Sequence, residues 1–141
     1  IVERMTRKGF MLWIKDKTAK AILQAVNKFK NTLPKGAVKT ITLDNGSEFA
    51  RLSELKGIGV YYAHPYSAYE RGSNENYNGI IRRFLPKGKD LSHFSQQDLN
   101  RINNWIDSYP RKILGYQSAQ AAFEKELQTI LFPLGGIKAT A

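Results

Sequence analysis

Two carboxylates of this chain stand where they could do chemistry, and the first of them is Asp44. Asp44 ends a run of β-branched and apolar residues and is followed at once by Asn-Gly. Asn-Gly is the strongest short-range indication of a β-hairpin, so an ordinary turn is one interpretation. The next apolar residues, Phe49, Leu52 and Leu55, are spaced as on a helix rather than alternating as in a strand. A strand, an aspartate, a tight turn and a helix form an α/β unit, in which ligands bind at the carboxyl ends of strands.

The second carboxylate, Glu75, lies in a segment that is unusual for a helix. Residues 73–84 have helical spacing but include three asparagines and a central glycine. Asparagine lowers helix propensity, and glycine costs about 1 kcal/mol relative to alanine. One face of this helix would carry a carboxylate, a carboxamide, a bare backbone and a guanidinium, from Glu75, Asn78, Gly79 and Arg82. A solvated glutamate on a polar helix is the alternative.

Together the two carboxylates suit a divalent cation. Carboxylate oxygens are hard ligands of the kind that Mg²⁺ and Mn²⁺ prefer. Two such ions can activate an attacking oxygen and stabilise a leaving oxygen at a phosphodiester. Asp44 and Glu75 are therefore candidates both as catalytic residues and as metal ligands.

The composition is that of a single basic domain. The 141 residues carry a formal net charge of +10, 42% of them are hydrophobic, and the absence of cysteine excludes disulfides and thiolate metal sites. No apolar run is long enough to cross a bilayer. Lys and Arg residues are concentrated in residues 1–39 and 82–112. This distribution indicates a polyanionic partner, nucleic acid first and a membrane surface second, although a merely soluble basic protein would share it.

The elements that must position these residues are strands and helices in alternation. Apolar or alternating runs predict strands over residues 9–14, 38–43 and 59–64. Besides the helix after Asp44, helical spacing predicts four more helices. The first begins at Asp16 or Thr18 and ends before Pro34, and the second covers residues 73–84. The third begins at Ser95, and the fourth begins near Ser118. The last two are expected to bury Leu99, Ile102, Ile106 and Tyr109, and Phe123, Leu127, Ile130 and Leu131, respectively.

Five short motifs follow one another along the chain. They are DNGxEF at residues 44–49, PYS at 65–67, RGxNENxNG at 71–79, PKG at 86–88 and PRKxLGY at 110–116. Each motif is weak alone. Their ordered combination, from about residue 1 to residue 123, resembles the catalytic core of bacterial DDE transposases of the insertion-sequence-thirty family. The resemblance implies an α/β fold of the ribonuclease H-like integrase type, with a mixed sheet flanked by helices.

The same resemblance implies an Asp-Asp-Glu triad in which Asp44 is the second acid and Glu75 the third. Such a triad, with two Mg²⁺ or Mn²⁺ ions, cuts transposon ends and joins their 3′-hydroxyls to target DNA. The implied protein is homo-oligomeric, cytoplasmic, associated with the nucleoid and without a membrane partner. The first acid is expected on a strand upstream of residues 2–4. Asp16 is no substitute, because it follows the predicted strand over residues 9–14 and begins the next helix.

We therefore expect an amino-terminally truncated catalytic core over residues 1–132, which lacks the first, central strand, and a loose tail over residues 133–141. Backbone N–H and C=O groups that face a missing strand lose their hydrogen-bond partners, and each buried group left unpaired costs about 1–3 kcal/mol of stability. The isolated chain is accordingly expected to fold poorly and to lack strand transfer. An inactive transposase remnant with at most weak, non-specific DNA binding is the alternative function, and a ribonuclease H-type nuclease acting on RNA–DNA hybrids is another.

Several side chains near these acids are expected to contact DNA. The favoured residues are Arg71, Asn74, Asn78, Arg82, Arg83, Lys87, Arg111 and Lys112. Contacts of this kind position DNA rather than read its sequence, and each charged one could equally be a solvated surface charge. His64 is expected to be a packed or exposed histidine. Trp13, Trp105 and Tyr77 are expected in the core or half-buried, rather than as platforms for base stacking.

Overall fold

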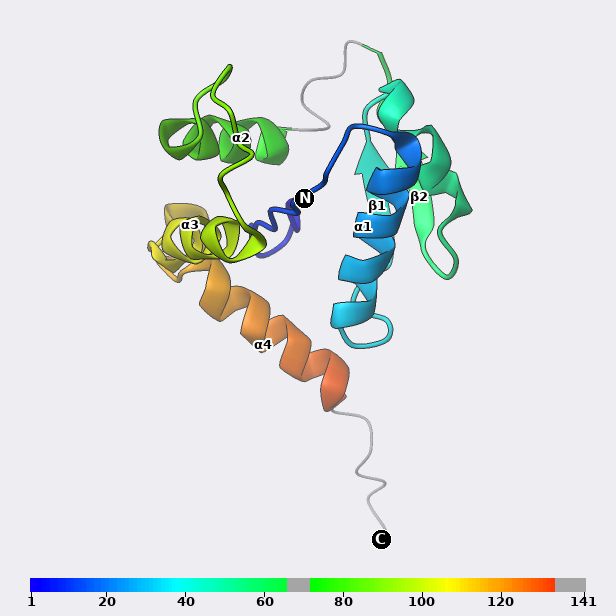
Figure 1. Cartoon of the computed structure of the whole chain (residues 1–141). Coiled ribbons are helices and arrows are strands. Elements are labelled where there is room, and N and C mark those ends of the chain that lie inside the picture. Colours follow the sequence, from blue (N-terminus) through cyan, green and yellow to red (C-terminus); the bar gives the residue numbers. More distant parts are fainter. Residues whose placement is uncertain (66–71, 134–141) are drawn as a thin grey trace, which may run out of the picture.

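The computed structural model describes residues 1–65 and 72–133, and Figure 1 shows how their helices and strands are arranged. In chain order the elements are α1 (Ala19–Thr32), β1 (Thr40–Leu43), the 3₁₀ helix η1 (Ser47–Glu54), β2 (Gly59–Tyr62), α2 (Gly72–Phe84), α3 (Gln96–Ser108), the short 3₁₀ helix η3 (Lys112–Leu114) and α4 (Ala119–Leu131). Helices combined with a parallel pair of strands confirm the predicted α/β class. The ribonuclease H-like assignment stays a prediction.

The apolar face of α1 forms the first core together with η1. Thr18 caps α1, as predicted, because its hydroxyl oxygen accepts a hydrogen bond from the first turn at 3.2 Å. Ile22 and Val26 of α1 are buried with Leu52 and Leu55. Burying a side chain of this size contributes about 1.5–3 kcal/mol. This packing holds the crossover between the two strands in place.

The two strands pair in parallel, with Thr40 opposite Gly59 and Leu43 opposite Tyr62. The predicted helix after Asp44 is present as η1, which makes the crossover, so the Asn-Gly pair forms no hairpin. Because the strands are parallel, their carboxyl ends lie at the same edge of the sheet. Among the described residues the sheet has only these two strands, fewer than the predicted mixed sheet.

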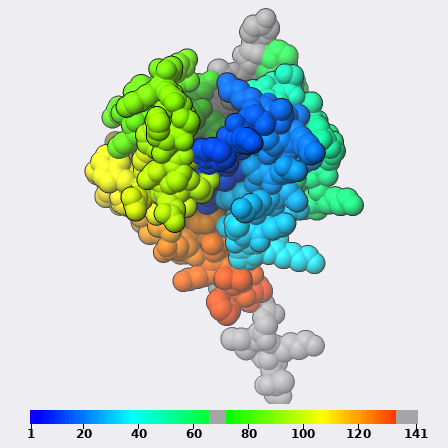
Figure 2. All heavy atoms as spheres, in the orientation of Figure 1, coloured from blue at the N-terminus to red at the C-terminus, as the bar shows by residue number. Residues whose placement is uncertain are grey.

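The strand predicted over residues 9–14 is wrong. The segment makes an isolated antiparallel bridge at Gly9 and is otherwise irregular. The Trp13 N–H donates to the Gln96 side-chain oxygen at 2.8 Å, and the Gln96 side-chain nitrogen donates to the Met11 carbonyl at 2.8 Å. A side chain at the start of α3 thus satisfies backbone groups that a neighbouring strand would otherwise pair. Figure 2 shows this amino-terminal segment, in dark blue, between α1 and the part of the chain around α3.

Helices α2, α3 and α4 form a second group (Figure 1). Within it, α3 packs against both α2 and α4. A capping box begins α3: the Asp98 N–H donates to the Ser95 hydroxyl at 3.2 Å, and the Ser95 N–H donates to the Asp98 carboxylate at 2.9 Å. The predicted start of this helix at Ser95 is therefore confirmed, as is the start of α4, which Ser118 caps.

The predicted buried faces of α3 and α4 are partly wrong. In α3 the buried side chains are Leu99, Asn103, Ile106 and Asp107, whereas Tyr109, just beyond the helix, is 49% exposed. In α4 only Ala119 is buried, Phe123, Leu127 and Ile130 are half-buried, and Leu131 is exposed. The reason in α4 is that its carboxyl-terminal end extends away from α3 (Figure 1). The reason in α3 is a buried polar network, described below.

Residues 134–141, which make up most of the predicted tail, lie outside the described residues, as does Arg71. The division into a core over residues 1–132 and a tail stays a prediction. None of the helices in the part of the chain that the structure describes is long and apolar enough to cross a membrane.

Candidate functional site

Asp44 directly follows β1, at the edge where the two parallel strands end. Its Oδ1 accepts a hydrogen bond from the Gly46 N–H at 3.1 Å, which closes the turn into η1. The Asn45 side-chain nitrogen donates to the Ala63 carbonyl at 3.1 Å and ties this turn to the end of β2. Asp44 itself is half-buried. The turn therefore holds a carboxylate at the strand end, where ligands bind in an α/β unit.

Glu75 lies in the first turn of α2 and is exposed. Asn78, Gly79 and Arg82 are exposed with it, so the predicted polar face exists along α2. A side chain added at Gly79 would meet no atom within 4 Å. Packing among the described residues therefore does not require a glycine here. On this face the glycine leaves the backbone open to the close approach of a partner.

Asp44 and Glu75 lie on separately packed parts of the chain. Asp44 belongs to the β1–β2 unit, whereas α2 packs against α3 (Figure 1). Across residues 1–65 and 72–133, no three His, Asp or Glu side chains gather into a group that could hold a metal ion. The two carboxylates suit a divalent cation by donor type, but the described residues do not complete a site. The catalytic and metal-binding roles of both residues stay predictions.

A buried ionic network joins α3 to the amino-terminal segment. Its centre is Asp107, which is fully buried. The Asp107 Oδ2 lies 3.1 Å from Lys8 Nζ, and its Oδ1 lies 3.2 Å from Arg111 Nη2. The Gly9 N–H donates to Oδ2 at 3.1 Å, and the Asn103 side-chain nitrogen donates to the same oxygen at 3.0 Å. Since a buried charge is stable only with such partners, the network fixes segments that are 98 positions apart in the sequence.

Tyr77 extends this network to α2. It is 2% exposed, and its hydroxyl donates to Asn103 Oδ1 at 2.9 Å. Burial first, and then the negative charge of Asp107, raise the pKa of Tyr77, so its hydroxyl stays protonated and remains a donor. A methyl group at Gly9 would overlap the Tyr77 ring, so the close approach of the amino-terminal segment to α2 requires glycine. The network thus positions the helix that carries Glu75.

The sequence predictions name none of Lys8, Asn103 and Asp107 as site residues. One pattern could have indicated the last two: Asn103 lies four residues after the buried Leu99 and four before Asp107, so polar residues interrupt the buried stripe of α3. A polar residue in such a stripe requires a buried partner. No spacing in the sequence indicates that the partner is Lys8.

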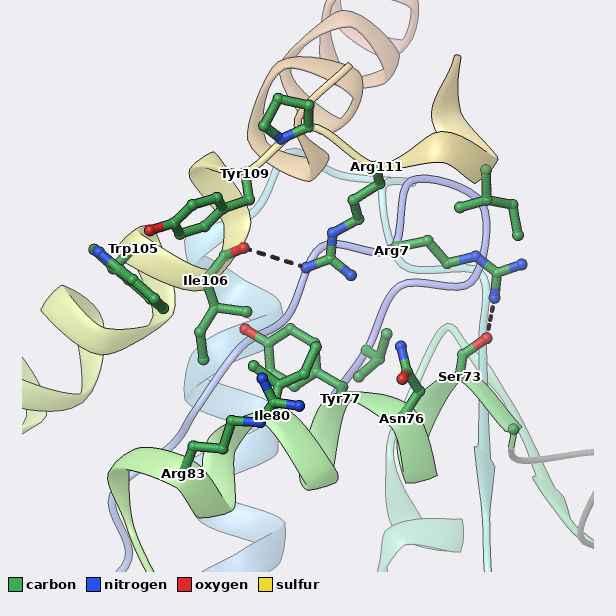
Figure 3. A pocket seen from close by; sticks show the side chains of 14 residues that line it. Arg7, Ser73, Asn76, Tyr77, Ile80, Arg83, Trp105, Ile106, Tyr109 and Arg111 are labelled. Carbon is green, nitrogen blue, oxygen red and sulfur yellow. Dashed lines mark hydrogen bonds between the residues drawn. The ribbon is translucent and has the colours of Figure 1, made fainter. Parts of the chain in front are cut away.

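A groove of about 790 Å³ lies beside this network, between α2 and the end of α3 (Figure 3). Its lining includes Arg7, Ser73, Arg83, Trp105, Tyr109 and Arg111. The Arg7 guanidinium donates to the Ser73 hydroxyl, which joins the amino-terminal segment to the first turn of α2. Arg111 also donates to the Ile106 carbonyl at 3.4 Å. Three arginines from three parts of the chain therefore converge on one concave surface.

The predicted DNA-binding residues have different environments. Asn78, Arg82, Arg83, Lys87 and Lys112 are exposed, Asn74 is half-buried, and Arg71 lies outside the described residues. The Arg111 side chain is only 16% exposed and is bound to Asp107. His64 is exposed just beyond β2, in agreement with one of the two environments expected for it. Contact of these residues with DNA stays a prediction.

The chain is similar to several bacterial transposases. It is 45% identical over 124 residues to a probable transposase for the insertion-like sequence element IS1161 of Streptococcus salivarius, a match that covers 88% of this chain and 35% of that protein. It is 39% identical over 121 residues to the transposase for insertion sequence element IS1086 of Cupriavidus metallidurans, over 84% of this chain and 36% of that protein. It is 32% identical over 128 residues to the transposase InsI for insertion sequence element IS30C of Escherichia coli, over 89% of this chain and 33% of that protein.

These matches cover nearly the whole of this chain but only about a third of the length of each relative. No protein-family model matches the chain.

Proposed function

Because the chain belongs to the insertion-sequence-thirty family of transposases, we propose that it forms part of the catalytic region of an enzyme that cuts transposon ends and joins them to target DNA. The observation that carries this proposal is the similarity to named transposases over 84% to 89% of the chain. The net charge of +10 suits a polyanionic substrate. The position of Asp44 at the carboxyl edge of two parallel strands suits a catalytic carboxylate.

In this proposal Asp44 is the second acid of the site and Glu75 the third, and the first would lie on a strand upstream of residues 2–4. Carboxylate oxygens suit divalent cations such as Mg²⁺ or Mn²⁺. When bound, these ions would activate an attacking oxygen and stabilise the leaving oxygen. The turn hydrogen bond from the Gly46 N–H orients the Asp44 carboxylate at the end of β1. The buried network around Asp107 and Tyr77 sets the position of Glu75.

The exposed face of α2 would meet the DNA backbone. Arg82 would contact a phosphate, and the bare backbone at Gly79 would allow the strand to approach closely. Asn78 directly precedes Gly79, is exposed on the same face and can donate to a phosphate oxygen or to a sugar. The intact enzyme would act as a homo-oligomer on two partners, the transposon ends and the target DNA.

A chimeric enzyme tests this proposal. The segment of the Streptococcus salivarius relative that aligns with this chain is replaced by this chain, and transposition of a marked element is counted in cells. The chimera is expected to transpose. Asp44→Asn and Glu75→Gln are each expected to reduce transposition by roughly a thousandfold or more, since loss of a residue of a catalytic unit has an effect of that order.

Two exposed acids outside the proposed site, Asp90 and Glu124, provide the matched controls. Asp90→Asn and Glu124→Gln make the same chemical changes and are expected to leave the transposition frequency within a factor of two or so. A chimera that remains active with Asp44→Asn would disprove the assignment of the site. A soluble chimera without any transposition would instead favour the alternative, an inactive remnant that binds DNA weakly.

A further inference from the structure

The groove between α2 and α3 has the charge of a phosphate-binding surface. Among the described residues, its lining contains Arg7, Arg83 and Arg111 and no acidic residue. Two described acids interact with these arginines, Asp107 with Arg111 and Glu3 with Arg7. Asp107 is shared between Lys8 and Arg111, and the carboxylate of Glu3 accepts hydrogen bonds from Met5 and Thr6. Within the part of the chain that the structure describes, these two acids are outnumbered by the three arginines and Lys8, so this set of charges has an excess of positive charge.

Arg83 is the arginine of the groove that is best placed to meet a ligand. It is exposed, and within the described part of the chain no ion pair involves it. Arg7 and Arg111, in contrast, are oriented by Ser73 and Asp107. The groove thus combines two pre-oriented guanidinium groups with one that can adjust to a phosphate.

Two aromatic rings at the end of α3 also line the groove. Trp105 is 50% exposed and Tyr109 is 49% exposed. Their rings pack edge to face, with centroids 4.6 Å apart, and Trp105 packs in the same way on Phe84, with centroids 4.8 Å apart. The rings are therefore held in position by one another while half of each surface stays open. This differs from the burial of Tyr77 and provides a surface on which a nucleobase can stack.

The groove lies on a different face of α2 from Glu75. Ser73, Tyr77 and Arg83 face the groove or the network beside it (Figure 3), whereas the exposed face carries Glu75 and Arg82. A DNA strand on the exposed face of α2 could therefore turn an unpaired nucleotide toward the groove. A stacked duplex offers no base face to Trp105, since its bases are covered by their neighbours.

We propose that this groove binds an unpaired nucleotide of a DNA strand, with the base stacked on Trp105 and its phosphate held by Arg83. The proposal rests on the proposed function only in taking DNA as the polyanion. It adds a second contact surface, specific for single-stranded DNA, to the helix that carries Glu75.

Fluorescence of Trp105 tests the proposal. The chain has two tryptophans, and Trp13→Phe leaves Trp105 as the only one. This variant of the 141-residue chain is titrated with a short oligothymidine, with an abasic oligomer of the same length and with a short duplex. Oligothymidine is expected to quench Trp105 and to bind about tenfold more tightly than the abasic oligomer, because stacking on one aromatic ring is worth about that factor.

Arg101 provides the matched control for Arg83. It is exposed on α3, carries the same charge and does not line the groove. Arg83→Gln is expected to weaken the binding of oligothymidine by roughly five- to tenfold and Arg101→Gln by less than about twofold. Because both side chains are exposed, neither substitution removes packing that the fold requires.

Equal affinities for oligothymidine and the abasic oligomer, or equal effects of Arg83→Gln and Arg101→Gln, would overturn the groove proposal. Binding of the duplex without any change in Trp105 emission would do the same while leaving the proposed transposase function intact. The two proposals can also fail in the opposite way. If oligothymidine quenches Trp105 but the chimera still transposes with Asp44→Asn, the groove proposal stands and the catalytic assignment of Asp44 is disproved.

Discussion

Asp107 is the residue on which the arrangement of the second helical group depends most. It is fully buried and carries a charge that Lys8 and Arg111 compensate at 3.1 and 3.2 Å. Lys8 is itself only 5% exposed. Removing the carboxylate leaves this ammonium group buried without its counter-charge, and breaking a buried pair in this way costs about 3–5 kcal/mol. We expect Asp107→Ala to lower the free energy of unfolding by that amount, as measured by urea titration.

The exposed pair between Arg51 and Glu54 is the control for Asp107. These side chains also lie within ion-pair distance, at 2.7 Å, but both are about half exposed. Exposed pairs contribute little because water solvates the separated charges nearly as well. Glu54→Ala should therefore leave the urea midpoint unchanged within error. Equal losses in the two variants would show that burial does not determine the contribution of Asp107.

At the scale of a single element, α2 combines a helix-weakening glycine with an exposed polar face. Because a Cβ added at Gly79 would meet no described atom within 4 Å outside the backbone of its own helix, Gly79→Ala should stabilise the chain by about 0.4–1 kcal/mol. If the bare backbone admits DNA, the same substitution should weaken duplex binding severalfold. Urea titration and a DNA-binding isotherm on one preparation measure both effects.

Gly9→Ala is the contrasting variant for Gly79→Ala. The new methyl group would overlap the Tyr77 ring, so this substitution should destabilise the chain by about 1–3 kcal/mol, the usual cost of overpacking. A stabilised Gly79→Ala variant with unchanged DNA affinity would contradict the role assigned to the exposed face of α2.

The start of α3 gives the chain a measurable dependence on pH. The Ser95 N–H, and next its hydroxyl, hold the pKa of Asp98 below its ordinary value of 3.8. A carboxyl group whose pKa is lower in the folded state contributes stability above the unfolded pKa, and this contribution is lost as the pH falls through the folded pKa. Between neutral pH and about pH 4 the contribution is therefore present, and below that it declines.

Asp98→Asn isolates this contribution from those of other carboxyl groups. Asp16 and Asp90 also have lowered pKa values, so the unmodified chain and the variant will both lose stability in acid. We expect the unmodified chain to lose stability more steeply than the variant below about pH 4. Parallel curves of urea midpoint against pH would contradict a role for the ionised carboxylate in the capping box.

At the scale of the whole molecule, few large apolar side chains are buried. Among the described residues, the buried apolar side chains are Ile22, Val26, Leu52, Leu55, Ala63, Tyr77, Leu99, Ile106 and Ala119. The sheet has two strands within the described residues, and such small sheets are marginal on their own. Less apolar surface is therefore removed from water than in a protein of this length with one continuous core.

We therefore expect the isolated chain to unfold at low denaturant concentration and in a broad thermal transition. When less surface becomes exposed on unfolding, the free energy of unfolding depends less steeply on denaturant concentration. Differential scanning calorimetry and urea titration of the 141-residue chain test this expectation. A sharp, cooperative transition would contradict it, and with it the sequence-based expectation that the chain alone folds poorly.

Much of the element order could be predicted because helix starts are local. Thr18, Ser95 and Ser118 each cap a helix through a hydrogen bond that spans three residues. The polar face of α2 could be predicted for the same reason, since residues three and four apart share a face. Asp44 could be placed at a strand end because a short β-branched run and helical spacing flank it.

The sequence by itself thus determined which residues form helices, the position of Asp44 after a strand and the family to which the motifs belong. Tertiary structure alone decided that residues 9–14 bind side chains of α3 instead of pairing as a strand, that Asp107 is buried and that three arginines converge on one groove. The physical reason is the range of the interactions. A cap or a helical face depends on neighbours within one turn, whereas the partners of Gly9 and Trp13 lie 98 and 83 positions away, where no local spacing can indicate them.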